Sequence, residues 1–540
     1  MLLAILAFLT FLVWGIFAFN RGMFQDETFT LEEVYQVKAG ISRFILPVVS
    51  PTSVFGSDPY ALALLVPSPV AALQFFYGVT WLAGGVFTAI VLAQIFPRRR
   101  WLAFAGGCLT ICATGDYLAD SLVALTYEVS ALFSFVMLAC QLAFLKTGKL
   151  RWLAMSVAAL AISLGNTDVA FAPIVLTPAL LWLVEGRFSR RVKTASLAMA
   201  CVFGPYLVVF ARFLVDPHSY AAIAIEPMTL AARAHRVVAA YLHNFAPWTW
   251  GRMRRNWFPP LPVVVPNWIR IWGPVAGALA FLAGSRRLGA AIRNEEPAGS
   301  QPARDLLFVA AFLTMALACN STQGILHYAQ FFYRSQILSR FWASMAVALA
   351  SGLLLRMRSP LRWVGILLAL TFVGLGVDGG LDRQDYYLAY WKRHRVELES
   401  IVRAVPRLKA PARLVLRIPE PPPYFLATQA DYLAQSWATL LEGDPSMWDR
   451  TFLIGPYGDQ RCAVEGANIV CRNSKSEVLS RVNVSESVVL SYHPAENRYL
   501  LDSRLPPEIS RGSADSDATY RPRRWIVAGP VSPMARRLLE

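Results

Sequence analysis

The sequence predicts an α-helical polytopic membrane protein with a small C-terminal α/β domain. Hydrophobic residues make up 56% of the 540 residues, and charged residues only 16%. Uncharged apolar runs close to the ~20 residues that a bilayer requires recur along the chain up to about residue 379. After that point, short apolar stretches alternate with Pro, Gly and Asp turns. The chain therefore carries more apolar surface than one soluble core could bury.

About eleven transmembrane helices are predicted from the apolar runs. Two of these runs, 101 to 115 and 306 to 319, are shorter than the ~20 residues of a usual span. The first helix lacks a basic n-region and an A-x-A-type cleavage site, so we expect it to be retained rather than removed as a signal peptide. The predicted spans are 2 to 19, 71 to 96, 101 to 115, 121 to 145, 152 to 166, 168 to 185, 194 to 214, 267 to 284, 306 to 319, 339 to 355 and 361 to 378.

The basic residues predict the orientation of these helices. The net charge is +16, but the Lys and Arg residues are dispersed between apolar runs rather than gathered on one face, which argues against nucleic acid as a partner. By the positive-inside rule, the basic loops are cytoplasmic. The N-terminus is then cytoplasmic, the C-terminal domain is extracytoplasmic, and the chain is integral to the cytoplasmic membrane. Every second loop is basic: 98 to 100, 146 to 151, 187 to 193, 286 to 304 and 356 to 362.

Two domains follow from this map. Residues 1–379 form the transmembrane domain, with a first external loop at 20–70 and a large external loop at 215–266. Within the first loop, the apolar spacing over 31 to 49 is typical of a helix lying in the membrane interface. Residues 380–540 form the α/β domain. Its short apolar stretches, which are typical of strands, are 413 to 418, 451 to 455, 487 to 492 and 524 to 529. Residues 428 to 442 have a helical period, and 506 to 524 is expected to be an irregular extension.

Cys462 and Cys471 are the only cysteines outside the apolar runs. They flank two short strand-like pieces around a Gly-Ala-Asn turn, in a compartment where disulfides persist. A bridged hairpin and two free thiols are both compatible with this pattern, and the bridge is our prediction.

An adjacent acidic pair, Asp26-Glu27, lies a few residues beyond the first apolar run. Acids near lipid are costly unless something uses them. The alternative is structural, because Asp26 or Thr28 could cap the helix that follows. A second acid, Asp116, falls in the short external loop after the third helix, where it could instead be part of a solvated turn.

This layout resembles the GT-C class of integral membrane glycosyltransferases. The shared features are one transmembrane helix, an acidic pair just outside it, a long first external loop, about ten further helices and an extracytoplasmic C-terminal domain. This class includes the protein O-mannosyltransferases and the lipid A aminoarabinose transferase. The resemblance implies inverting transfer of a sugar from a polyprenyl phosphate to an acceptor on the outer face. It also implies that Asp26 is the base, that Glu27 completes the acidic pair and that Asp116 is a second acid in the same cavity.

Such a reaction needs external cations for the departing phosphate. Arg334 and Arg340, which enter the tenth helix among aromatic residues, are our candidates. The aromatic and basic residues of the loop 215–266 are better explained as anchors on lipid headgroups. No metal or other cofactor is predicted, although the question whether a divalent ion binds between Asp26 and Asp116 is left open.

Two further classes compete with an enzyme. No Walker loop, HExxH, GxSxG or CxxC motif supports soluble-type chemistry. A transporter would place charged groups at mid-bilayer, whereas these acids cluster at the outer helix ends. A non-enzymatic subunit of an envelope assembly, with membrane partners, stays as the alternative. In either case the bilayer is a partner, and the acceptor is not specified by the sequence.

Overall fold

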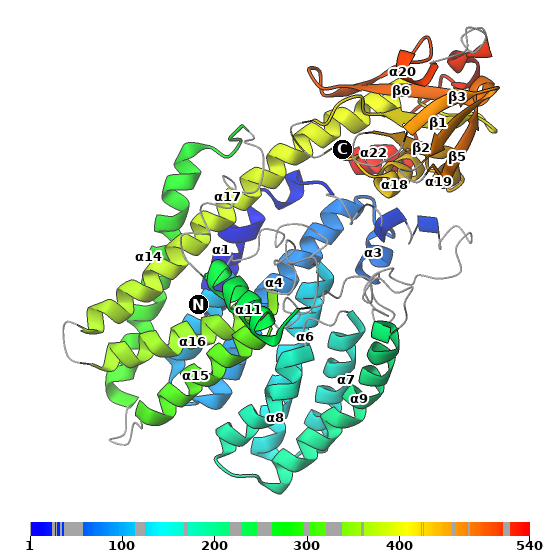
Figure 1. Ribbon diagram of the computed structural model, residues 1–540. Coiled ribbons are helices and arrows are strands. Elements are labelled where there is room, and N and C mark those ends of the chain that lie inside the picture. Colours follow the sequence, from blue (N-terminus) through cyan, green and yellow to red (C-terminus); the bar gives the residue numbers. More distant parts are fainter. Residues whose placement is uncertain are drawn as a thin grey trace. The chain divides into compact units, whose positions relative to one another are not determined.

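The computed structural model describes residues 2–23, 28, 30–32, 35–36, 58–113, 125–166, 171–215, 228–245, 262–295, 302–319, 337–357, 361–422, 424, 426–455, 461–472, 476–510 and 519–539. The chain divides into two compact units (Figure 1). The membrane unit comprises Met1–Phe19, Leu46–Asp58 and Gln74–Tyr387, and the C-terminal unit comprises Asn20–Ile45, Pro59–Leu73 and Leu388–Glu540. Most described residues of the first external loop therefore belong with the C-terminal domain, a division that differs from the one the sequence suggested.

A helix occupies each of the eleven predicted spans. The first span is α1 (Leu2–Thr10), continued by a π-helical turn (Phe11–Gly15) and a 3-10 turn (Ala18–Asn20). Two further helices, α3 (Asp58–Ala63) and α11 (Leu230–Phe245), lie in the predicted external loops. The others are α4 (Pro69–Ile95), α5 (Arg100–Cys112), α6 (Leu125–Thr147), α7 (Leu150–Asn166), α8 (Phe171–Glu185), α9 (Arg190–Val215), α14 (Asn267–Glu295), α15 (Pro302–Ala318), α16 (Ile337–Arg356) and α17 (Leu361–Ala404).

Six helices of the described part are long and apolar enough to cross a membrane: the first span, α4, α6, α9, α16 and α17. Helices α5, α7 and α8 are apolar but shorter. Helix α17, the last of these six, runs to Ala404, well beyond residue 378, where the predicted span ends. It ends where Pro406 follows, because a proline disfavours helical geometry in the residue before it.

The basic connections meet at one end of the membrane unit. The buried carboxylate of Asp305 pairs with Arg99 at 2.8 Å and with Arg356 at 3.0 Å. Arg304 donates to the carbonyl of Val184, and Arg191 donates to the carbonyls of Leu145 and Lys146. These contacts link residues from all five loops that the sequence identified as basic. The alternation of basic loops is therefore matched by a shared basic end of the helices.

The C-terminal half of α17 also fixes neighbouring segments of the membrane unit. Asp385 accepts hydrogen bonds from the backbone N–H groups of Val264 and Val265, both at 2.6 Å, just before α14 begins. Asp382 pairs with Arg270 of α14 at 2.7 Å. The paired carboxylates hold α14 and α17 together at this level, which explains why charged residues are tolerated in the continued helix.

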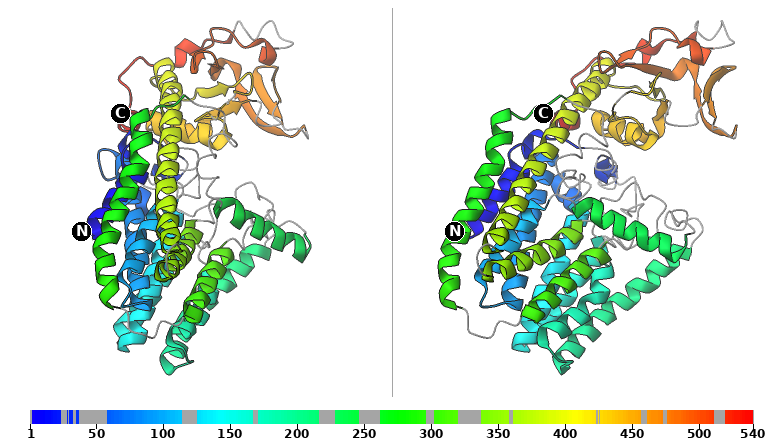
Figure 2. Two further views of the ribbon diagram at one scale, coloured as in Figure 1. Left: turned by 90° about the vertical axis from the view of Figure 1, so that its left-hand side faces the viewer. Right: turned by 60° about the vertical axis from the view of Figure 1, so that its left-hand side comes forward.

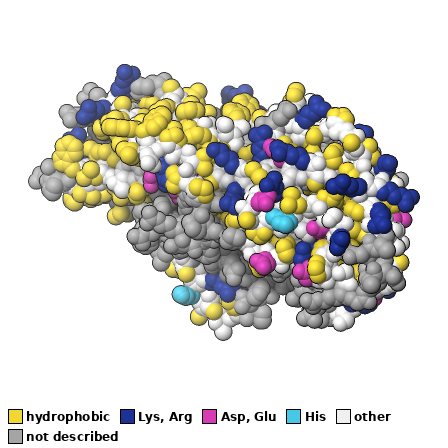
Figure 3. Space-filling model, turned by 90° about the horizontal axis from the view of Figure 1, so that it is seen from above, with side chains coloured by type: hydrophobic (Ala, Val, Ile, Leu, Met, Phe, Trp, Pro, Cys, Tyr) yellow, Lys and Arg dark blue, Asp and Glu magenta, His cyan; other side chains and the backbone are white. Residues whose placement is uncertain are grey.

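Part of the surface is strongly apolar. Figure 3 shows hydrophobic side chains gathered over one part of the visible face and Lys and Arg side chains spread over another. Several large apolar side chains are exposed on the membrane-unit helices, as expected for surfaces that face lipid. On α14 they are Trp268, Ile271, Trp272, Val275 and Leu279.

The C-terminal unit contains a four-stranded sheet with the order β2-β1-β6-β7. The strands are β1 (Arg413–Arg417), β2 (Thr451–Ile454), β6 (Ser487–His493) and β7 (Arg498–Leu501). β1 is parallel to both β2 and β6, and β6 and β7 form an antiparallel pair. Helix α18 (Asp431–Glu442), followed by the short α19 (Met447–Arg450), connects β1 with β2. The predicted α/β character of this region is therefore present.

A second, three-stranded antiparallel sheet contains β3 (Arg461–Glu465), β4 (Asn468–Arg472) and β5 (Val478–Asn483). Cys462 and Cys471 are directly opposite each other on β3 and β4 and form a disulfide. Gly466, in the two-residue turn between these strands, has φ +62°, a conformation that glycine adopts without strain. The structure thus contains the bridged hairpin.

Two expectations for the C-terminal region need correction. In the segment 506–524, of which 511–518 lies outside the described residues, Pro507–Ser510 is a short helix, and Ile509 and Tyr520 are buried in the core with Val415 and Val489. The apolar run after Arg524 does not form a strand. It contributes a 3-10 turn (Pro522–Trp525) and one bridge from Ile526, and the final helix is α22 (Pro533–Leu539). Apolar pattern alone did not distinguish a core-packed coil from a strand.

Described parts of the first external loop contact the C-terminal region within its unit. The Tyr35 hydroxyl donates to the carbonyl of Gly443 at 2.8 Å, and Arg537 of α22 donates to the carbonyl of Pro67 at 2.9 Å. A Cβ atom at Gly22 would lie 2.2 Å from the ring of Trp391, so only glycine fits there. These three contacts explain why the loop and the domain form one compact unit.

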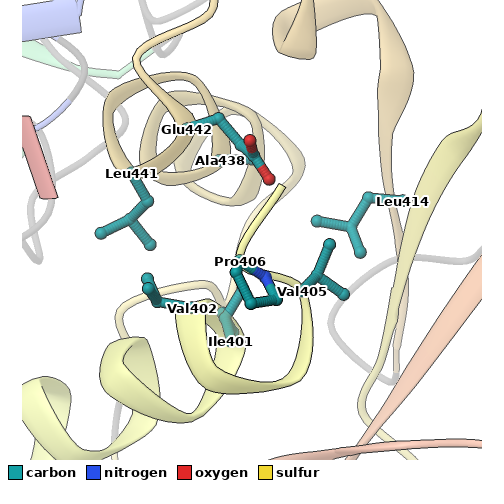
Figure 4. A pocket seen from close by; sticks show the side chains of 8 residues that line it. All are labelled: Ile401, Val402, Val405, Pro406, Leu414, Ala438, Leu441 and Glu442. Atoms are coloured by element: carbon teal, nitrogen blue, oxygen red, sulfur yellow. The ribbon is translucent and has the colours of Figure 1, made fainter. Parts of the chain in front are cut away.

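A small pocket lies between the end of α17 and α18, with room for about one water molecule (Figure 4). Its lining is apolar except for Glu442, whose carboxyl group points into it (Figure 4). Burial raises the pKa of Glu442 to about 7, although a hydrogen bond to the Leu408 backbone and the charge of Arg450 act in the opposite direction.

Candidate functional site

A buried ion pair joins the first turns of α6 and α16. Nη2 of Arg340 lies 2.6 Å from Oε2 of Glu128, and the two residues are only 6% and 0% exposed. Charged side chains inside membrane helices are costly, are almost always paired, and commonly mark a functional site. This pair is therefore the first feature of a candidate site.

An aromatic face lies against the guanidinium of the pair. The Cζ atom of Arg340 is 3.4 Å from the centroid of the Trp81 ring on α4, within the range of a cation–π interaction. The indole N–H of Trp81 donates to the carbonyl of Ile111 at 3.0 Å. Ile111 belongs to the last turn of α5. Four helices therefore meet at Trp81, Glu128, Arg340 and Ile111, which we call the ion-pair cluster.

Close packing of α4 and α5 positions this cluster. A Cβ atom at Gly107 would lie 2.8 Å from the carbonyl oxygen of Gly85, so glycines allow the two backbones to approach each other. Trp81 also stacks with Tyr77, which in turn stacks with Trp14 at 4.2 Å between ring centroids. Trp14 lies in the π-helical turn of the first span. The first helix thus supports the same aromatic group.

The cluster lies at the end of the helices opposite the basic end. Helix α5 begins at Arg100, beside the basic end, and Ile111 follows eleven residues later, a rise of about 16 Å. Helix α16 runs the other way, with Arg340 in its first turn and Arg356 at its last residue. The positive-inside rule predicts that this end of the helices is extracytoplasmic.

Of the residues proposed from the sequence, one lies in this cluster. Arg340, predicted as a phosphate ligand, is held by Glu128 and Trp81. Asp26, Glu27, Asp116 and Arg334 fall outside the described residues. Their roles stay predictions, and so does the phosphate-binding role of Arg340.

Sequence reasoning missed two residues of the site. Glu128 is the only acid in the predicted span 121 to 145, and that isolation was the signal that could have identified it. Arg383 is a second buried cation, only 5% exposed on α17, and its charge acts on Glu128. It was missed because the predicted span ended at 378, which placed Arg383 in the external domain.

The described residues contain no group of three His, Cys, Asp or Glu side chains that could hold a metal ion. The sequence left open whether a divalent ion binds between Asp26 and Asp116, and neither acid is among the described residues. The side chains described around the ion pair are one carboxylate, an aromatic face and the guanidinium group of Arg340, with the buried Arg383 as a further cation.

Comparison with known proteins found similarity only to solved structures. No protein-family model matches the sequence, and no curated protein does. ArnT from Cupriavidus metallidurans bound to undecaprenyl phosphate is 15% identical, with a TM-score of 0.38, and the alignment covers 83% of this chain and 88% of that chain. The apo state of ArnT gives 15% identity and a TM-score of 0.37, with 82% and 83% covered. With similarity at this level, the function has to be argued from the residues of this chain.

Proposed function

We propose that this protein is a membrane glycosyltransferase that moves a sugar from a polyprenyl phosphate to an acceptor on the outer face of the membrane. The observation that carries the proposal is the ion-pair cluster. It places a buried arginine, its paired carboxylate and an aromatic face at the end of a membrane-spanning bundle that is opposite the basic connections. A lipid-linked phosphate would present its anionic group at this level of the bilayer.

Chain connectivity supports the involvement of Asp116 and Arg334. Asp116 is three residues after Ala113, where α5 has just ended beside the cluster, and Arg334 is three residues before α16 begins. Three residues of extended chain span at most about 11 Å. The two connections that carry these residues therefore start from helix ends that already meet at Trp81.

The proposed reaction is an inverting displacement. The carboxylate of Asp26 takes the proton of the acceptor hydroxyl while the acceptor oxygen forms a bond to the anomeric carbon. The bond between that carbon and the phosphate oxygen breaks, and the lipid phosphate leaves with the bonding electrons. Arg334 and Arg340 stabilise the developing phosphate charge, while Glu27 and Asp116 line the acceptor side.

Pairing with Glu128 is compatible with a phosphate-binding role for Arg340. A guanidinium carries five N–H donors in a fixed planar arrangement, so one group can contact a carboxylate and a phosphate together. Glu128 would then orient Arg340, and Trp81 would fix the plane of its guanidinium. Asp26 carries the base role alone, so it is the residue to test first.

The experiment uses the full chain reconstituted in liposomes with radiolabelled polyprenyl-phosphate sugars prepared from bacterial membranes, together with a bacterial membrane extract that supplies the acceptor hydroxyl. Asp26→Asn should abolish release of the sugar from the lipid, whereas Asp58→Asn, a carboxylate change in the same external loop, should leave release unchanged. Normal release by Asp26→Asn would disprove the base role.

A second measurement does not depend on the sugar. Native mass spectrometry should show that the chain binds undecaprenyl phosphate and that Arg334→Ala weakens this binding. A chain that neither binds undecaprenyl phosphate nor releases sugar would favour a non-enzymatic envelope subunit.

A further inference from the structure

Helix α11 is amphipathic, and its apolar side is unusually complete. At 100° per residue, the apolar side chains fall within an arc of about 140°. The remaining arc carries the polar residues Arg233, His235, Arg236, His243 and Asn244, together with three alanines. The apolar arc consists of Leu230, Ala231, Ala234, Val237, Val238, Tyr241, Leu242 and Phe245.

The exposure of α11 is the reverse of that of a surface helix in a soluble protein, which buries its apolar stripe. Leu230 is 83% exposed and Val238 is 43% exposed. Arg233 and Arg236 are half-buried, and Nε of Arg233 donates to the carbonyl of Met228 at 3.3 Å. The helix therefore turns its arginine side toward the protein and leaves most of the described apolar arc uncovered.

The position of α11 in the chain places it beside the membrane. It lies between α9, a candidate span, and α14, in the connection at the end opposite the basic loops. α9 starts at the basic end, where Arg191 contacts Leu145, and its 26 residues extend about 39 Å. Both views of Figure 2 show α11 running across the neighbouring helices of the membrane unit rather than alongside them.

We propose that α11 lies in the plane of the membrane interface and inserts its apolar arc among the lipid acyl chains. The bilayer is the occupant because it surrounds α9, the candidate span that precedes α11, and α16 and α17, candidate spans later in the chain. An in-plane amphipathic helix has this pattern, with an apolar face in the acyl-chain boundary and a basic face turned away from it.

Neighbouring helices extend the same lipid-facing surface. Large apolar side chains are exposed on α15, which α11 contacts, and on the later turns of α9. On α15 they are Leu306 and Leu307, next to Asp305 at the basic end, and Leu313, nearer the end where α11 lies. On α9 they are Leu207, Val208 and Val209. The exposed arc of α11 therefore adds to an apolar surface that the spans already present.

Fluorescent labels on α11 test this placement. The full chain carries Cys201→Ser to remove the exposed thiol, since the other described free cysteines are buried. Single cysteines replace Val238 or Ala234 on the apolar arc, or Ala239, which is exposed on the opposite side. Each variant is labelled with the environment-sensitive dye NBD and reconstituted in phosphatidylcholine vesicles. Quenching by a doxyl-labelled lipid is then compared with quenching by aqueous iodide.

The expected result is a blue-shifted emission at Val238→Cys and Ala234→Cys, with a lipid-to-iodide quenching ratio several-fold higher than at Ala239→Cys. Equal ratios at the three positions would overturn the proposal, because the arc would then face water. Protection of the Val238 and Ala234 labels from both quenchers would overturn it as well, because a protein surface would then cover the arc. Variants that fail to give a monodisperse protein in detergent are replaced by Ala231→Cys, on the same arc.

Discussion

The ion pair between Glu128 and Arg340 gives the sharpest prediction about the site. At 2.6 Å and an effective dielectric constant of about 20, the attraction between the two charges is about 6 kcal/mol. Desolvation of two buried groups opposes most of it. Removing one partner leaves the other charge buried without compensation, which costs roughly 3–5 kcal/mol. Glu128→Ala should therefore strongly destabilise the protein.

A double variant separates stability from function. Glu128→Leu with Arg340→Met replaces the pair by apolar groups of similar size, and such replacements are often neutral or stabilising. We expect the double variant to unfold near the temperature of the unmodified protein. If Arg340 also contacts the lipid phosphate, the same variant should bind undecaprenyl phosphate weakly and release no sugar.

The assay is thermal unfolding of the purified chain in detergent, followed by the binding and release measurements described above. Glu399→Gln is the control, because Glu399 forms only exposed pairs along one helix, each worth a few tenths of a kcal/mol. An unchanged unfolding temperature for Glu128→Ala would refute the buried pair. Full activity of the stable double variant would refute the phosphate role of Arg340 while leaving the structural role intact.

Three further predictions concern other parts of the chain. Asp305→Asn should destabilise the protein by roughly 1–3 kcal/mol, because the buried carboxylate loses two charged partners, Arg99 and Arg356; thermal unfolding against Glu399→Gln measures this. Cys462→Ser should lower stability by about 2.5 kcal/mol, from the loop entropy of nine residues, and mass spectrometry after alkylation without reductant should find Cys471 modified only in this variant. The folded-state pKa of Glu442, about 7, lies above the unfolded value near 4.5, so the folded state binds the proton more tightly and stability should fall as pH rises from 4.5 to 7, by at most about 3 kcal/mol. Unfolding curves at pH 5 and pH 8 should show this loss in the unmodified protein and not in Glu442→Gln; equal losses in both would contradict the assignment.

Much of the membrane unit could be predicted from the sequence, because membrane helices have a strong local signal. An apolar run had identified each bundle helix that the structure describes, and the alternation of basic loops had identified the ends that meet at Asp305. The predicted span ended at 378, whereas the helix α17 continues through Asp382 and Asp385 to Ala404. Their carboxylates are satisfied by Arg270 and by two backbone N–H groups, and these partners lie more than a hundred residues away in the sequence.

The C-terminal unit was less predictable because its contacts also join segments that are far apart in the sequence. Helix α18 and strands β1, β2 and β6 were found from local pattern, but their order in the sheet depends on pairings between distant segments. Burial of Tyr520 and the contact of Tyr35 with Gly443 are likewise long-range. For the site, the isolated acid Glu128 carried a readable signal, whereas the stacking of Trp81 on Arg340 depends on how α4 and α16 pack.

The most direct test of the central claim is an experimental structure of the chain with a polyprenyl-phosphate sugar bound. We expect the phosphate to contact Arg334 and Arg340 beside Trp81. We also expect a carboxylate oxygen of Asp26 to lie within about 3–5 Å of the position where the acceptor hydroxyl attacks the anomeric carbon. Separations among Asp26, Asp116 and Arg334 too large for one bound substrate would contradict the catalytic account.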